Sequence, residues 1–251
     1  MLAKIHADEP RSARDLRGEV AAAQSALLLI VGIVASAPLA LVAVALVHPQ
    51  PPWRDAAQFA AEFHWIQVTP YVGGFLLVAS CVALIASLCS LMPAARRARA
   101  NFALAVTAAF AALIVLNYIV QTTLVPSLVS PYHDDNGPLV TMLTMSSPRS
   151  FGWALEMWGY AVFGVATWAI APAFGSSRLE RATAALFVLN GIASIAAAVA
   201  TSLWPGSPMT APGFIGFAVW NALMVTMAVL VILVMRRRVS GNVATPRARL
   251  G

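Results

Sequence analysis

Five polar residues fall inside long apolar stretches of this 251-residue sequence, where their side chains could do chemistry. Glu156 and Tyr160 are four residues apart, as are Asn117 and Gln121, so each pair shares one face of a helix. A protonated carboxyl group in lipid can donate to an amide, and an ionised one can act as a base or bind a cation. Together with Asn221, these residues form a candidate ligand-binding layer.

Six apolar stretches position these residues, and each is long enough to cross a bilayer as a helix. The backbone must satisfy its own hydrogen bonds in hydrocarbon, and the alternating pattern of a membrane barrel does not occur. The sequence therefore predicts an all-α fold, a polytopic bundle of six transmembrane helices over residues 21–235. We expect the spans at 21–47, 66–92, 101–125, 151–173, 182–203 and 213–235.

The basic residues predict the orientation of the bundle. Of the 16 Lys and Arg residues, only Arg54 and Arg149 fall outside the two tails (1–20 and 236–251) and the loops after the second and fourth spans. Loops rich in Lys and Arg remain in the cytoplasm. We therefore expect both tails in the cytoplasm (N-in/C-in), with the five polar residues at similar depth in the outer half.

The composition excludes several classes of protein. Hydrophobic residues make up 60% of the chain and charged residues 10%, whereas soluble domains contain about 25% charged residues. The net charge of +6 lies between apolar stretches rather than on an aromatic-rich basic face, so we expect no nucleic-acid partner. No phosphate-binding glycine loop or HExxH motif occurs, and we expect no cofactor.

The predicted outer loops contain most of the histidines and several carboxylates. These are ligand types that suit zinc and other divalent metals. However, their spacing matches no metal-binding motif and they come from separate loops, so we expect no metal site. The residues are His48, Asp55, Glu62 and His64 in the first outer loop, and His133, Asp134 and Asp135 in the second.

Segment 116–190 contains several short motifs that occur together. They are Asn117-Tyr118 with Gln121, Trp153-Ala154-Leu155-Glu156, Gly159-Tyr160, Ala171-Pro172 with Phe174, and Leu179-Glu180-Arg181. In these motifs, about a third of the chain resembles a group of uncharacterised bacterial multi-spanning membrane proteins. The resemblance implies a protein of the bacterial inner membrane. The group has no assigned activity, so the resemblance implies no catalytic role.

Three functions are compatible with these features. The first is a structural or accessory membrane subunit whose polar layer only fixes packing. The second is a binding or transport protein for a small apolar or amphipathic ligand, such as a lipid, held near Glu156 in the outer half. The third is an intramembrane enzyme that uses Glu156 as acid or base, and it is the least favoured. The bilayer is the expected partner, and association into an oligomer stays open.

Overall fold

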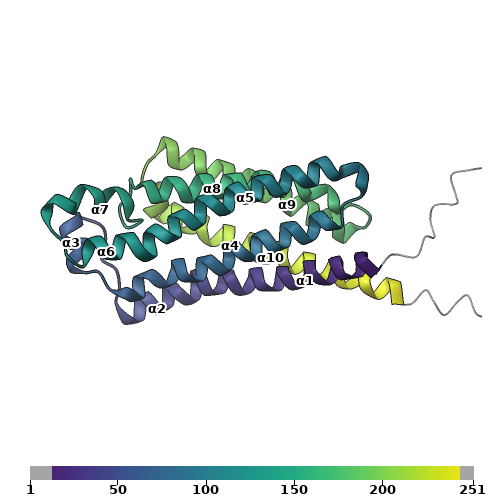
Figure 1. Cartoon of the computed structure of the whole chain (residues 1–251), viewed down its shortest axis with the longest axis horizontal. Coiled ribbons are helices and arrows are strands. Elements are labelled where there is room, and N and C mark those ends of the chain that lie inside the picture. The colour runs from purple at the N-terminus through teal and green to yellow at the C-terminus, as the bar shows by residue number, and fades with distance from the viewer. Residues whose placement is uncertain (1–12, 244–251) are drawn as a thin grey trace, which may run out of the picture.

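The computed structural model describes residues 13–243, and in this range the chain is helical and contains no strand (Figure 1). Six helical segments are long and apolar enough to cross a membrane. The chain is therefore an all-α, multi-pass membrane protein, as its hydropathy predicts. The segments are Asp15–Val47, Trp65–Ser90, Ala94–Val129, Phe151–Ala173, Arg178–Leu203 and Ala211–Ser240.

The main helices of these segments pack as a ring in chain order. Each contacts the next, and the last closes the ring against the first. Glycines allow close approach: a Cβ on Gly164 would lie 2.8 Å from the Cα of Gly191 on the neighbouring helix. The helices are α1 (Ala13–Val34), α4 (Thr69–Ser90), α5 (Arg97–Ile119), α8 (Phe151–Ile170), α9 (Arg178–Leu203) and α10 (Ala211–Val243).

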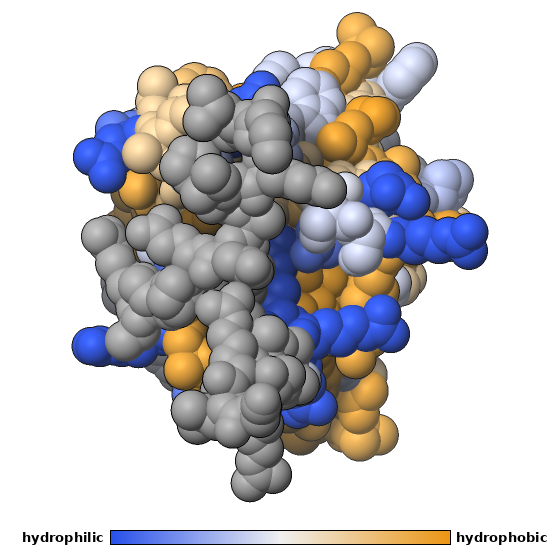
Figure 2. Space-filling model, turned by 90° about the vertical axis from the view of Figure 1, so that its right-hand side faces the viewer, coloured by the Kyte–Doolittle hydropathy of each residue, from blue (hydrophilic) through white to orange (hydrophobic). Residues whose placement is uncertain are grey.

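The first helix begins before, and the last helix ends after, the apolar stretch that predicts it. Helix α1 begins at Ala13 and α10 continues to Val243, so both extend into the regions expected as tails. The other tail residues, 1–12 and 244–251, lie outside the described part of the chain. Both helix ends lie at the same end of the bundle (Figure 1), which we call the basic end. Hydrophilic side chains project around its rim, beside apolar flanks (Figure 2).

The opposite end of the bundle has a cap made of three short helices, α3 (Ala56–Ala61), α6 (Val125–Val129) and α7 (Gly137–Leu143) (Figure 1). They enclose a second, smaller hydrophobic core that includes Phe59 of α3 and Val140 of α7. Asp55 caps the start of α3, where its carboxylate accepts the Gln58 N–H at 2.7 Å. This hydrogen bond and the adjacent Arg54 guanidinium hold the pKa of Asp55 below its ordinary value.

Two spans contain a π-helical turn, a form often found at functional sites. The first, Ala35–Leu39, contains Pro38, which lacks an N–H and so cannot continue the α-helical pattern. It joins α1 to α2 (Ala40–Val47). The second, Val120–Leu124, joins α5 to α6 and contains Gln121. One member of the candidate layer thus lies at a local irregularity of its helix.

Candidate functional site

Gln121 joins the bundle to the buried loop between α7 and α8. Its side chain is only 3% exposed. The amide Nε2 donates to the Leu143 carbonyl at 2.8 Å, and Oε1 accepts the Met145 N–H at 3.1 Å. Because one backbone partner is an acceptor and the other a donor, this pairing fixes the orientation of the amide.

The orientation of Gln121 determines the direction of the next hydrogen bonds. Gln121 Nε2 also donates to Asn117 Oδ1 at 3.3 Å, so Asn117 Nδ2 faces Glu156 and donates to its Oε2 at 3.0 Å. The Tyr118 hydroxyl donates to Glu156 Oε1 at 3.1 Å and lies 3.4 Å from the Tyr160 hydroxyl. Both carboxyl oxygens therefore accept hydrogen bonds from neutral donors. We call these five side chains the outer network.

Aromatic rings from neighbouring helices pack against the two tyrosines of the outer network. Tyr118 packs against Phe75 with ring centroids 5.8 Å apart, and Tyr160 packs against Trp220 at 4.7 Å. Gly74 allows α4 to approach, since a Cβ there would lie 2.3 Å from the Tyr118 ring. The Glu156 side chain, by contrast, is only half-buried. The carboxyl group is thus held by hydrogen bonds to both of its oxygens, although the residue as a whole is not fully buried.

The structure brings four of the five candidate residues into one network and leaves Asn221 outside it. Asn221 Nδ2 instead donates to the Phe217 carbonyl of its own helix, at 2.8 Å. Its neighbour Trp220 is the residue that faces inward, where its indole N–H donates to Asn190 Oδ1 at 3.0 Å. Asn190 in turn donates to Thr167 Oγ1 at 3.3 Å. Trp220 is thus a contributor that the sequence did not single out, and Tyr118, which the sequence placed only in a short motif with Asn117, joins the candidate residues.

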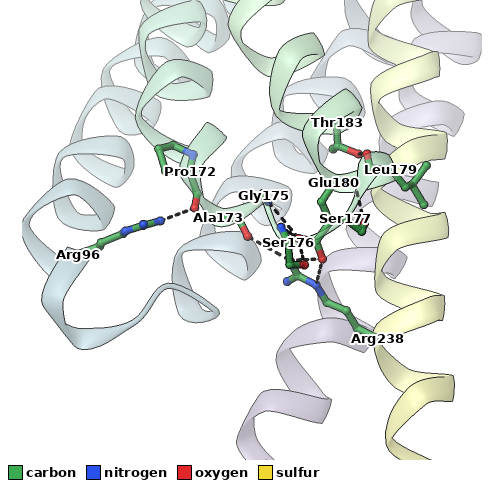
Figure 3. A network of polar contacts seen from close by, with 10 residues as sticks. All are labelled: Arg96, Pro172, Ala173, Gly175, Ser176, Ser177, Leu179, Glu180, Thr183 and Arg238. Carbon is green, nitrogen blue, oxygen red and sulfur yellow. Dashed lines mark hydrogen bonds and ion pairs between the residues drawn. The ribbon is translucent and has the colours of Figure 1, made fainter. Parts of the chain in front are cut away.

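A buried carboxylate, Glu180, lies at the basic end (Figure 3). Its Oε2 accepts the backbone N–H groups of Gly175 and Ser176 at 3.0 and 2.8 Å. Its Oε1 lies 2.9 Å from both Nε and Nη2 of Arg238, near the end of α10. Arg238 also donates to the Ala173 carbonyl at 3.1 Å. This ion pair, which we call the latch, joins α10 to the turn between α8 and α9.

The latch had no signal in the sequence. Glu180 and Arg238 are 58 residues apart, and each looks like an ordinary charge beside a span. On the same turn, Arg96 donates to the Pro172 carbonyl (Figure 3). Two arginines from separate helical segments therefore hold the α8–α9 turn in place. This geometry is that of a structural contact between helices.

The two histidines of the segment between α2 and α4 also come together. His48 and His64 stack with ring centroids 5.0 Å apart, and His48 Nε2 lies 3.0 Å from the Glu62 carbonyl oxygen. Within residues 13–243, no group of three or more His, Cys, Asp and Glu side chains is arranged to hold a metal ion. Cys81 and Cys89 are both buried as free thiols.

Comparison with known proteins adds no further assignment. The chain matches no protein-family model, and neither the curated proteins nor the solved structures contain a match to it. Any role for the outer network therefore has to be argued from its own geometry. On that geometry the chain is a multi-pass integral membrane protein with a hydrogen-bonded carboxyl group towards its capped end and an ion-pair latch at its basic end.

Proposed function

We propose that this protein is a structural or accessory membrane subunit without enzymatic activity, in which the outer network holds the cap on the helical bundle. One observation supports this most directly. The Gln121 amide pairs with the backbone on both sides of Thr144, at the point where the chain leaves α7. Leu143, whose carbonyl the Gln121 amide binds, is itself part of the smaller hydrophobic core enclosed by α3, α6 and α7, the cap core.

The outer network has the properties of a structural tie. Its amides and hydroxyls bond to one another, to Glu156 and to the backbone. Side-chain hydrogen bonds between membrane helices contribute roughly 0.6–2 kcal/mol each. Several of them in one place are sufficient to fix the position of a short segment such as the loop before α8.

We further propose that the protein resides in a bacterial cytoplasmic membrane with its basic end in the cytoplasm and its cap outside. The described arginines at the basic end support this orientation, because basic loops remain in the cytoplasm. Among them Arg97, Arg99, Arg178 and Arg181 are exposed. Labelling of single cysteines introduced at Arg97 and at Asp134 in intact cells tests the orientation. Labelling at Arg97 by a membrane-impermeant reagent would contradict it.

The role of Glu156 is tested by Glu156→Gln in detergent-purified protein, with Asn221→Leu as the control outside the network. A glutamine places an N–H opposite the Tyr118 or Asn117 donor, which leaves one buried group without a partner and costs about 1–3 kcal/mol. We expect the melting temperature of Glu156→Gln to fall by several degrees and that of Asn221→Leu to change little. An unchanged or higher melting temperature for Glu156→Gln would contradict a structural role.

A second function, binding of a small amphipathic ligand with a cationic group, is favoured by the arrangement around Glu156. Neutral donors converge on the carboxyl group, and among the described residues no cationic side chain forms an ion pair with it. An ammonium group of a ligand would supply the ion-pair partner that the described residues do not. Native mass spectrometry of the purified protein tests this function. A small molecule retained by the wild type and lost from Glu156→Gln would support binding, and equal spectra would oppose it.

A further inference from the structure

A groove of about 320 Å³ lies on the surface of the bundle, between α5 and α8 and near the basic end. Ala169, which is 7% exposed, forms its floor, and the large rings of Phe102 and Trp168 form its walls. Val165 completes the apolar lining. Arg99, in the first turns of α5, contributes the only charged side chain of the lining. The groove is therefore apolar along its length and basic at one end.

One wall of the groove, the Trp168 ring, is held in place by contacts within the protein. The Trp168 indole N–H donates to the Val188 carbonyl at 2.7 Å. The ring also covers Gly191 so closely that a Cβ there would lie 2.2 Å from Trp168 Nε1. Beyond the end of α8, the bond from Arg96 to the Pro172 carbonyl joins the start of α5 to the following turn (Figure 3). A preformed groove loses little conformational entropy on binding.

The charged end of the groove is available to a ligand. Arg99 is exposed, and within residues 13–243 no hydrogen bond or ion pair engages its guanidinium group. It lies at the basic end, where the rim is hydrophilic and the flanks are apolar (Figure 2). An arginine at this level can extend its guanidinium group towards the lipid head groups while its stem stays in the apolar region.

We propose that this groove binds a phospholipid with an anionic head group. The phosphate would lie against Arg99, because guanidinium groups bind phosphate through two parallel hydrogen bonds. One acyl chain would lie over Ala169, between Phe102 and Trp168. Basic pockets between transmembrane helices are suited to anionic lipids for the same reason, the combination of local charge and apolar contact. The bilayer supplies such a ligand directly to this face.

Native mass spectrometry of the detergent-purified protein tests the proposal with two probes, phosphatidylglycerol and phosphatidylcholine of identical acyl chains. We expect the wild type to retain phosphatidylglycerol preferentially. Arg99→Gln should reduce that preference about fivefold, the effect of one basic residue worth about 1 kcal/mol near the head groups. Arg181→Gln, an exposed arginine at the same end but outside the groove, should leave the preference unchanged.

Val165→Trp separates groove binding from general charge attraction. The larger side chain fills the groove without altering charge, so we expect it to weaken retention of both lipids. Equal losses in Arg99→Gln and Arg181→Gln would overturn the proposal, because they would indicate diffuse attraction to the whole basic end. Equal retention of the two lipids by the wild type would also overturn it. Arg99→Gln alters an exposed side chain, so its result stands even if Val165→Trp folds poorly.

Discussion

Replacing Gln121 with leucine tests whether the outer network fixes the cap. Leucine has a similar volume but cannot bond to the backbone, so the Leu143 carbonyl and the Met145 N–H lose their side-chain partner. Both residues are 8% exposed, and an unpaired buried polar group costs about 1–3 kcal/mol. We therefore expect a total loss of roughly 2–6 kcal/mol. For a chain of this length, that corresponds to a fall of roughly 4–24 °C in melting temperature.

Two measurements on the purified protein check this prediction. A thermal melt reports the global loss, and hydrogen exchange of peptides covering residues 143–150 reports the loop itself. Thr123→Val is the matched control, since Thr123 is in the same π-helical turn but is exposed and bonds only to the Ile119 carbonyl of its own helix. If Gln121→Leu has the same melting temperature as the control and its loop exchanges no faster than in the wild type, Gln121 does not hold the cap.

Three other changes probe separate parts of the molecule. Arg238→Met should lower the free energy of unfolding by about 3 kcal/mol, because it leaves Glu180 buried without its ion pair. The double variant with Glu180→Leu should recover much of that loss. A double-mutant cycle from thermal melts that shows simple additivity would contradict the latch. Gly74→Ala should cost about 1–3 kcal/mol, since the added Cβ displaces Tyr118, and the same change should be nearly harmless in a Tyr118→Ala background. The lowered pKa of Asp55 means that its cap of α3 is fully formed above the ordinary value of 3.8 and weakens as the pH falls below it. The protection of the Gln58 amide should therefore be constant above that pH and drop below it, and Asp55→Asn should remove that dependence.

The sequence predicts an all-α fold with six membrane-spanning helices because hydropathy is a local property. It also predicts two pairs in the outer network, since the i, i+4 spacing of Asn117 with Gln121 and of Glu156 with Tyr160 places each pair on one helix face. It does not predict how a helix is rotated about its axis when that helix is apolar on every side. Trp220 faces the bundle and Asn221 bonds to its own helix, a difference of one residue that the apolar sequence around them does not encode.

The sequence could not predict the contacts between distant segments, for a different reason. Gln121 binds backbone atoms of a loop, and backbone atoms carry no residue-specific signal. Glu180 and Arg238 look like two more charges at a membrane surface, and only the packing of α10 against α9 makes them a buried pair. The role of the outer network in binding or support stays a prediction until the Glu156 and Gln121 variants are measured.

The ring order of the helices sets an order of assembly during synthesis, when N-terminal segments emerge first. The cap core and the outer network draw on residues up to Tyr160, so both can form while α9 and α10 are still to be made. Helix α1 packs against α4, which is made early, and against α10, which is made last. One flank of α1 must therefore remain in lipid until nearly the whole bundle has been inserted. Arg238, near the end of α10, can join Glu180 only after that, so the ion pair forms late in assembly.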